Sequence, residues 1–247
     1  MSVTAKSKVA IIIPLYGYWK DASTEQLTAD TLKLTLDRIG SSVHQVYIIF
    51  VGEGDRVDSA VGSIVLGRVQ AGNATFVQME TGSSYADFIK AGLDFLKGIN
   101  TQFVININPW LVFQYDGIDI LVDRINRDDA KIVSGFDLRG LIEPVEFNTY
   151  KSPLPKEERN LCIDMFGLKT QFIDMLEFDS KYKTHYFIGR DMWQRMFVRG
   201  FESVSSQKIP IFTFEVDWTE LENGGDFEAD KLNFISKWGF DPSIKFD

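Results

Sequence analysis

The sequence has very few residues of the kinds that form disulfides or bind zinc. Its 247 residues include one cysteine, Cys162, and two histidines, His44 and His185. A single cysteine cannot form a disulfide within the chain, and Cys162 lies in an apolar run that favours a small buried residue over a nucleophile. The composition argues against a zinc site. His185 lies among basic and aromatic residues, but a structural role is favoured for it.

The chain also lacks an excess of positive charge and any long apolar segment. It has 26 Lys and Arg against 35 Asp and Glu, a formal net charge of −9. Nucleic-acid backbones are usually held by a basic surface, so nucleic acid is not an expected partner. No stretch approaches the roughly 18 apolar residues that span a bilayer, and no signal peptide is visible. We therefore expect a cytoplasmic protein without a transmembrane segment.

Three familiar motifs are missing as well. There is no G-x-S-x-G nucleophile elbow, no G-x-x-x-x-G-K-[ST] phosphate loop and no G-x-G-x-x-G fingerprint, because Gly52-Glu53-Gly54 continues as Asp-Arg-Val. These absences argue against an α/β-hydrolase, a P-loop NTPase and a dinucleotide-binding enzyme of the usual kind.

What the sequence does contain is an alternation of strand and helix patterns. Strands are predicted at Val9–Pro14, Val46–Val51, Ala74–Val77, Gln102–Asn108, Lys131–Ser134, Leu161–Leu168 and Ile209–Trp218. Helices are predicted at Thr24–Ile39, Ser84–Leu96, Gly117–Ile125, around Met192–Phe197 and at Phe227–Trp238. This alternation predicts an α/β fold with a mostly parallel central sheet and helices on both faces. Residues 143–160, with three prolines and seven charges, are predicted to be a long loop.

A parallel sheet fixes where a ligand would bind. Ligands of such sheets lie at the carboxyl ends of the strands, near the point where the strand order switches. The loops at Pro14–Tyr18, Gly52–Asp55 and Asn108–Trp110 each follow a predicted strand. We therefore expect these three loops to converge on one site.

Six segments, in chain order, resemble the motifs of one enzyme family. They are Val9–Tyr16, Phe50–Asp55 with Asp58, Glu80–Leu93, Phe103–Trp110, Gly189–Asp191 with Arg195 and Gly200, and Phe234–Gly239. They resemble, in turn, the V-x-I-I-I-P first strand, the acidic turn, the helix-start stretch, the D-x-D region, the E-D-x-D-x-x-x-R helix and the K-W-G segment. These are motifs of nucleotide-sugar glycosyltransferases of the GT-A fold, close to the large inverting family 2.

The resemblance implies a single GT-A (nucleotide-diphospho-sugar transferase) domain over residues 1–247. Residues 1–110 would form the nucleotide-sugar-binding half and residues 111–247 the acceptor-binding half. The implied reaction moves a sugar from a nucleotide-diphosphate donor to a hydroxyl of a glycan or lipid-linked acceptor, with inversion. Such a reaction belongs to polysaccharide or glycan biosynthesis.

The resemblance also assigns roles to single residues. Asp191 is the candidate general base, and we expect it to open a helix with its carboxylate at the first turn, where the helix dipole favours the ionised form. The residues expected to bind the donor are Pro14, Leu15, Tyr16, Glu53, Asp55, Asn106, Asn108, Trp110 and Arg190.

The chain departs from the family at its metal-binding motif. Trp110 replaces the last acid, while Asn106 and Asn108 are neutral amides, which are poor ligands for Mg²⁺ or Mn²⁺ on their own. Asn108 is the candidate metal ligand at the motif, and we expect weak or absent metal binding to the free protein. A divalent metal would then arrive together with the donor diphosphate.

Three explanations of this departure stay open. The chemistry is independent of metal, with the positive charge supplied by a residue such as Arg190; other acids, such as Asp116 or Asp119, hold the metal; or the protein is a degenerate GT-A-fold module that binds a nucleotide or glycan without catalysis. A nucleotidyltransferase is a further alternative, but it would normally carry a glycine-rich loop where this chain has Pro14-Leu-Tyr-Gly-Tyr18.

Overall fold

A computed structural model describes residues 6–16, 22–54, 59–127, 132–137, 161–200, 203–213 and 224–241. Asp55 and the loop predicted at 143–160 lie outside these residues. The strands are β1 (Lys8–Pro14), β2 (Gln45–Glu53), β3 (Ala74–Met79), β4 (Phe103–Ile107), β5 (Leu111–Phe113), β6 (Ile132–Asp137), β7 (Leu161–Lys169) and β8 (Ser203–Thr213). The helices are α1 (Ala22–Gly40), α2 (Ala60–Gln70), α3 (Tyr85–Leu96), α4 (Gly117–Arg127), the 3-10 helix η3 (Thr170–Met175), α6 (His185–Val198) and α8 (Gly224–Trp238).

The strands form one eight-stranded sheet in the order β3-β2-β1-β4-β7-β6-β8-β5. Strands β3, β2, β1 and β4 are parallel to one another, and β6 is parallel to β8. Strand β7 is antiparallel to both β4 and β6, and β5 is antiparallel to β8. The strand order switches direction between β1 and β4, which is where an open α/β sheet offers a ligand site.

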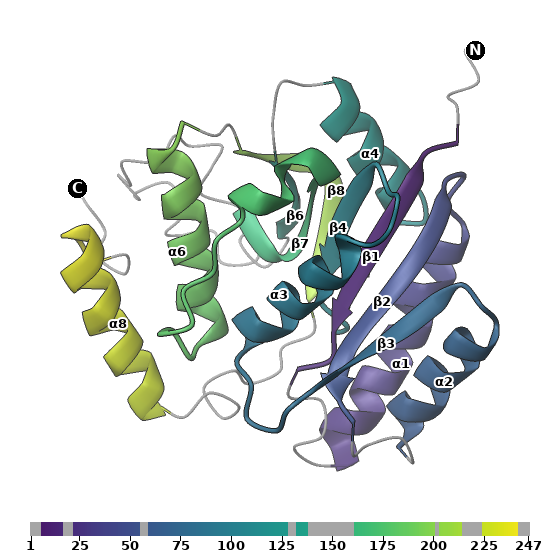
Figure 1. Cartoon of the computed structure of the whole chain (residues 1–247), viewed down its shortest axis with the longest axis horizontal. Coiled ribbons are helices and arrows are strands. Elements are labelled where there is room, and N and C mark those ends of the chain that lie inside the picture. Colours follow the sequence, from purple (N-terminus) through teal and green to yellow (C-terminus); the bar gives the residue numbers. More distant parts are fainter. Residues whose placement is uncertain are drawn as a thin grey trace.

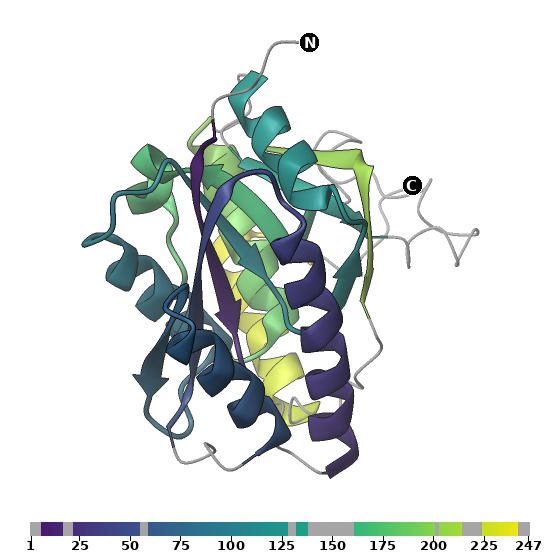
Figure 2. The same cartoon turned by 90° about the vertical axis from the view of Figure 1, so that its right-hand side faces the viewer.

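Helices cover both faces of the sheet, as predicted (Figure 1). Along β1 the side chains alternate: Val9, Ile11 and Ile13 belong to the core beneath α1, α2 and α4, whereas Ala10 and Ile12 belong to the core beneath α3, α6 and α8. Figure 2 shows α1, α2 and α4 on the near side of the sheet and α6 and α8 beyond it. Because both faces of β1 are covered, the strand is a continuous apolar run, as buried parallel strands are.

The predicted elements are confirmed apart from their ends, and three further elements were not predicted. Helix α2 begins at an N-cap, Ser59, whose side chain accepts a hydrogen bond from the Gly62 N–H, and the short β5 and η3 are also new. Strand β8 begins at Ser203, earlier than predicted, and the predicted continuation beyond Thr213 lies outside the described residues. Among the described helices, none is long and apolar enough to cross a membrane.

Candidate functional site

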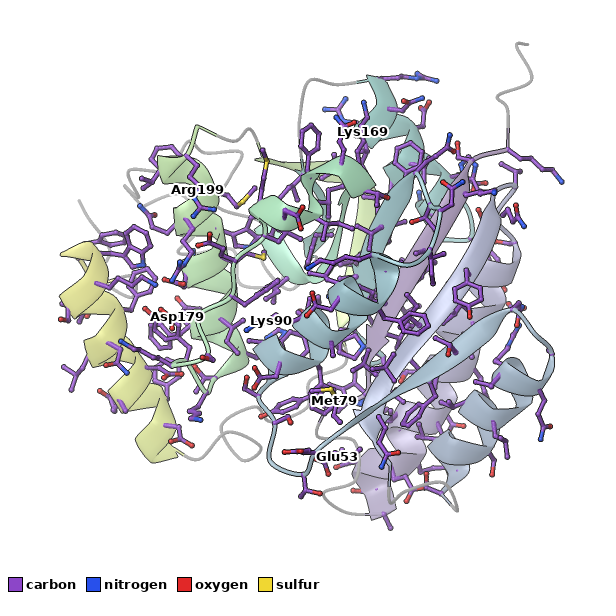
Figure 3. All side chains as sticks on the ribbon, viewed as in Figure 1. Glu53, Met79, Lys90, Lys169, Asp179 and Arg199 are labelled. Atoms are coloured by element: carbon purple, nitrogen blue, oxygen red, sulfur yellow. The ribbon has the colours of Figure 1, made fainter. Side chains whose placement is uncertain are left out.

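The carboxyl ends of β1, β2 and β4 lie at one edge of the sheet. Pro14 is level with Val51 on β2, and Ile12 is level with Asn106 on β4. Tyr16, Glu53 and Asn108, which end or follow these strands, therefore lie at the same edge, and Figure 3 shows Glu53 there. The predicted convergence of the three strand ends is confirmed for these residues.

A buried polar cluster occupies this edge beside β4. The side-chain amide of Asn108 donates to Asp164 Oδ1 at 3.1 Å, and Nε2 of His185 lies 3.1 Å from the same oxygen. The two backbones are also joined, because the Asn108 N–H donates to the Asp164 carbonyl at 2.7 Å. Asn108, Asp164 and His185 are 1%, 3% and 7% exposed. A buried carboxylate is costly unless it is paired, and the Asn108 amide donates a hydrogen bond to this one.

Tyr85, the first residue of α3, joins this cluster to the end of β1. Its ring meets the His185 ring edge to face at 4.4 Å between centroids and the Tyr16 ring at 5.8 Å. Asn106 donates to the Ile163 carbonyl at 3.0 Å and lies 3.4 Å from the Tyr85 hydroxyl. Its own Oδ1 is buried and has no hydrogen-bond partner among the described residues. Such an acceptor is suited to a ligand hydroxyl or a water.

Glu53 ties the end of β2 to the turn that precedes α3. It is buried, and its Oε1 accepts a hydrogen bond from the Gly82 N–H at 3.1 Å. Gly82 has φ +85°, a conformation that glycine adopts without a Cβ penalty. The carboxylate therefore shapes the rim of the site, and its contact with a nucleoside stays a prediction.

Trp110 and Leu15 are buried in the hydrophobic core beside the end of the sheet. Trp110 is 1% exposed and donates from Nε1 to the Thr28 hydroxyl on α1. Leu15 is equally buried in the same core, and Pro14 is buried at the end of β1. Its indole closes the hydrophobic layer between α1 and the end of the sheet, which argues against a contact with the donor, and that contact stays a prediction. Tyr16 is half-buried and packs on Tyr85 and Phe88.

Asp191 does not open a helix. Helix α6 begins at His185, and Asp191 lies within it at 1% exposure. Its Oδ2 accepts from Arg195 Nε at 2.7 Å, while its Oδ1 forms an ion pair with Lys237 Nζ at 2.7 Å and accepts from Trp238 Nε1 at 2.8 Å. The predicted place at the first turn of a helix is thus wrong: the carboxylate fastens α8 to α6.

The ion pairs around Asp191 extend to two more acids. Asp179 lies 2.8 Å from Lys237 Nζ and 3.0 Å from an Arg195 nitrogen, and Glu177 pairs with Arg195 and with Arg199 at 2.9 and 2.7 Å. Burial opposes the charge on Asp179, but the hydrogen bonds from Lys237 and the Lys181 N–H outweigh it and hold the pKa of Asp179 below its ordinary value. The Arg199 hydrogen bond likewise lowers the pKa of Glu177. Figure 3 places Asp179 and Arg199 beside α6, away from Glu53.

Asp230 of α8 sets the start of α6, although 46 residues separate it from Thr184. Thr184 is the N-cap residue, yet its own side chain caps nothing. Instead, Asp230 Oδ2 accepts from the N–H groups of Lys183 and Thr184, both at 2.7 Å, and from the Thr184 hydroxyl at 2.9 Å. The adjoining residue, His185, is held in place by this cap.

The described residues do not fit a divalent metal. Asn108 Oδ1 accepts from the Trp110 N–H at 3.0 Å while its amide group faces Asp164, so the expected ligand is turned toward protein partners. Within the described ranges no three His, Cys, Asp or Glu side chains are grouped to hold an ion. Asp119, an alternative ligand, binds Ser42 and Val43 at the opposite edge of the sheet, and Asp116 is exposed before α4.

Arg190, the other residue offered for the donor charge, projects from α6. Its guanidinium lies over the ring of Tyr186, 5.2 Å from the centroid. A cation over an aromatic face is stabilised, but it keeps its charge. Contact between Arg190 and a donor phosphate stays a prediction.

A hollow lies at the amino edge of the sheet. It has a volume of about 380 Å³, and its lining includes Gln102, Asn126, Lys169 and Thr170. Lys169 ends β7, which runs antiparallel to β4, so the hollow and Glu53 lie at opposite ends of the molecule (Figure 3). A substitution in this hollow can therefore serve as a control for substitutions at the carboxyl edge in ligand-binding experiments.

The sequence did not single out Asp164, Asp230 or Tyr85. The signal for Asp164 is a lone acid inside the apolar strand Leu161–Lys169, since a buried acid must have partners. Asp230 looks like any acid on an amphipathic helix, and its partner is distant in the chain. Tyr85 is one of eight tyrosines, without a distinguishing local pattern.

Comparison with known proteins gives a fold but no close relative. No protein-family model and no curated protein matches the chain. Three solved structures illustrate the similarity. Residues 1–349 of TarS from S. aureus align with a TM-score of 0.59 and 12% identity over 97% of this chain and 76% of that one. The mannosyltransferase PcManGT from Pyrobaculum calidifontis, in complex with GDP-Man and Mn²⁺, aligns with a TM-score of 0.63 and 13% identity. The alignment covers 94% of this chain and 65% of that one.

The third is glucosyl-3-phosphoglycerate synthase from Mycobacterium tuberculosis, in complex with Mg²⁺ and uridine diphosphate. It aligns with a TM-score of 0.59 and 13% identity over 96% of this chain and 81% of that one. At such identities the likeness concerns the fold. The eight-stranded sheet, its switch point and these alignments agree, and the chain has the GT-A fold of nucleotide-sugar glycosyltransferases.

Proposed function

We propose that this chain is a glycosyltransferase that moves a sugar from a nucleotide-diphosphate donor to a hydroxyl of a glycan or lipid-linked acceptor, with inversion. The observation that carries the proposal is the cluster at the carboxyl edge of β1, β2 and β4. Tyr16, Glu53, Asn106 and Asn108 come together there, in the fold whose solved examples hold GDP-Man and uridine diphosphate.

The edge supplies the kinds of groups that a nucleotide-sugar needs. A half-buried aromatic ring, Tyr16, offers an apolar face for a base or sugar, and the unpartnered Oδ1 of Asn106 offers an acceptor for a hydroxyl. The first half of the sheet carries these groups, in keeping with a donor-binding half at 1–110. Residues 111–247, with α6 and α8, would then bind the acceptor.

The proposal needs no resident metal. The described donor set does not suit Mg²⁺ or Mn²⁺, as the orientation of Asn108 illustrates. A metal that comes with the donor would be held chiefly by the diphosphate. We therefore expect the apo protein to bind Mn²⁺ weakly if at all.

A thermal-shift screen against UDP-, GDP- and dTDP-sugars tests the proposal. A donor that binds only the folded chain raises its unfolding free energy by about 2.7 kcal/mol at 100 times the dissociation constant. We expect one nucleotide class to raise the melting temperature in the presence of EDTA. If no nucleotide-sugar shifts it, with or without Mn²⁺, the proposed function fails.

Release of the nucleoside diphosphate from the stabilising donor then tests for catalysis. Chromatography of the incubated donor should reveal free diphosphate that increases with time and with protein concentration. A donor that binds and is never cleaved, in water or with added glycans, would instead make this a binding module on the same fold.

A further inference from the structure

We infer that the beginnings of α6 and α8 carry the acceptor site of the proposed transferase, and that this site takes a sugar with an anionic group, a carboxylate or a phosphate. The residues that form it are Tyr186, Arg190 and Phe227. The inference rests on the proposed glycosyltransferase function and deepens it, because it names the class of acceptor. It also moves Arg190 from the donor to the acceptor.

Two aromatic rings from different helices lie together at this place. The ring centroids of Tyr186 and Phe227 are 5.9 Å apart, with 38° between the ring planes. Both rings pack on the fully buried Phe187, at 5.0 and 5.1 Å between centroids, and the core between the helices thus supports them. Tyr186 and Phe227 are themselves half-buried, so each keeps exposed surface. An aromatic surface of this kind suits the apolar face of a sugar ring, and the Tyr186 hydroxyl adds a polar end.

Arg190 brings a positive charge to the same surface. It is half-buried, and its guanidinium lies 5.2 Å from the centroid of the Tyr186 ring. No ion pair joins it to an acid within the described part of the chain, although the sequence has 35 Asp and Glu against 26 Lys and Arg. A guanidinium binds a carboxylate or a phosphate through two parallel hydrogen bonds. Arg190 is therefore available to an anionic group of a ligand.

The stacked pair of Arg38 and Tyr115, elsewhere in the chain, gives a comparison. Arg38 lies 5.1 Å from the centroid of the Tyr115 ring, and its Nη1 donates to a backbone carbonyl of its own helix at 3.1 Å. The Tyr115 hydroxyl donates to Asp37 at 3.0 Å. Protein groups thus use the hydrogen bonds of that pair. The pair of Arg190 and Tyr186 makes no such side-chain hydrogen bonds to the residues that the structure describes.

The proposed acceptor site adjoins the edge where the donor would bind. Tyr186 follows His185, whose ring lies 4.4 Å from the Tyr85 ring, and the Tyr85 ring lies 5.8 Å from that of Tyr16. Figure 1 shows α6 between α3, which begins at Tyr85, and α8. A sugar on Tyr186 and Phe227 would then lie beside a donor bound at Tyr16. A transfer reaction requires this proximity of its two substrates.

A ligand-observed NMR titration with three small sugars tests the inference in the absence of donor. The probes are methyl β-glucuronide, glucose 6-phosphate and, as the neutral match, methyl β-glucoside. We expect one of the two anionic probes to bind at least about tenfold more tightly than the neutral one, because hydrogen bonds to a charged partner are the stronger ones. The two anionic probes distinguish a carboxylate from a phosphate. Equal binding of all three, or binding of none, would overturn the inference.

Substitutions locate the binding of the preferred anionic probe. Arg190→Gln should raise its dissociation constant about tenfold or more and change that of the neutral probe less than about threefold. Phe227→Leu should weaken both probes, because it replaces a ring by a smaller apolar side chain. The matched control is Arg38→Gln, which removes the other stacked arginine and should change neither constant. If Arg190→Gln bound the anionic probe as wild type does, Arg190 would not be the recognising group and the inference would be wrong.

Release of diphosphate from the stabilising nucleotide-sugar then tests whether the bound sugar is an acceptor. The preferred anionic probe should accelerate this release in wild type, and the acceleration should be lost in Arg190→Gln at the same probe concentration. The dissociation constant of the donor should change less than about threefold, because Arg190 contacts the acceptor. If Arg190→Gln instead weakened the donor and left the anionic probe unaffected, Arg190 would belong to the donor site and the inference would be overturned.

The outcomes also separate this inference from the function beneath it. If a nucleotide-sugar binds and neither anionic sugar does, the inference is overturned while the transferase proposal stands. If an anionic sugar binds and no nucleotide-sugar does, the proposed function has failed and the acceptor role falls with it.

Discussion

Asp230 caps α6 at Thr184 from another helix, α8. Its Oδ2 accepts two backbone N–H groups and the Thr184 hydroxyl, so three donors at the start of α6 share one carboxylate oxygen. An acid at a helix N-terminus is also favoured by the helix dipole. Through this contact α8 determines where α6 begins, and hence where His185 lies relative to Asp164.

Removing this cap should destabilise the protein. Asp230→Ala leaves buried N–H groups without an acceptor, which costs about 1–3 kcal/mol of unfolding free energy. Asp230→Asn should cost less, because an amide oxygen can still accept. Urea denaturation measures both, with Glu228→Gln, an exposed acid on the same helix, as the control. If Asp230→Ala had the same unfolding free energy as wild type, the cap would make no contribution to stability.

Asp191→Ala should act on stability rather than on the chemical step. The substitution removes the buried acceptor of the Trp238 indole and one of the acid partners of both Lys237 and Arg195, while Asp179 still pairs with Lys237. Breaking a buried pair costs about 3–5 kcal/mol, and the partial exposure of Arg195 and Lys237 reduces this to about 2–3 kcal/mol. Urea denaturation should detect the loss, while Asp94→Ala, in an exposed pair, should have no measurable effect. A stable Asp191→Ala protein that binds donor and no longer cleaves it would restore Asp191 as the base.

The α6–α8 ion pairs should make stability sensitive to acid. The pKa values of Asp179 and Glu177 are lowered from 3.8 and 4.5, so protonating either acid costs more in the folded chain than in the unfolded one. The two ionised acids therefore contribute their full share of the unfolding free energy at pH values above their ordinary pKa values. This share is lost as the pH falls through their lower pKa values in the folded chain. Urea denaturation at a series of pH values from about 6 to 3 should show this decline, and Asp179→Asn should flatten it. If the unfolding free energy of Asp179→Asn declined with acid as steeply as that of wild type, Asp179 would not be a source of the acid sensitivity.

Trp110→Phe distinguishes a core residue from a donor contact. The change removes the indole donor to Thr28 and part of a buried ring, so we expect a loss of about 1–3 kcal/mol in unfolding free energy. The dissociation constant of the stabilising nucleotide-sugar, measured by calorimetry, should stay the same. Tighter or weaker donor binding without a change in stability would return Trp110 to the donor site.

The sequence predicted those features of the fold that depend on local pattern. Strands such as Val9–Pro14 are continuous apolar runs, and their order predicts the edge where Tyr16, Glu53 and Asn108 meet. Helix α2 was missed because Ala60–Gln70 mixes glycine with β-branched residues, and its packing against α1 stabilises it.

Features that depend on tertiary contacts could not be predicted. The spacing of Asp191 and Arg195 anticipates their ion pair, but not Lys237 and Trp238, which arrive from α8 and occupy the rest of the carboxylate. Asp164 and His185 lie 21 positions apart, on a strand and a helix, and only the fold brings them together.

The central claim is that the carboxyl edge of the sheet is the donor site. It is tested by calorimetric titration of a nucleoside diphosphate into the wild-type, Tyr16→Ala and Lys169→Ala proteins, with the nucleoside of the donor that raises the melting temperature most. The account predicts that Tyr16→Ala weakens binding at least tenfold, since its ring forms part of that edge. Lys169→Ala, which alters the hollow at the amino edge, should bind as wild type does. Binding that survives Tyr16→Ala in a folded protein and is lost in Lys169→Ala would place the donor at the wrong end of the sheet and contradict the account.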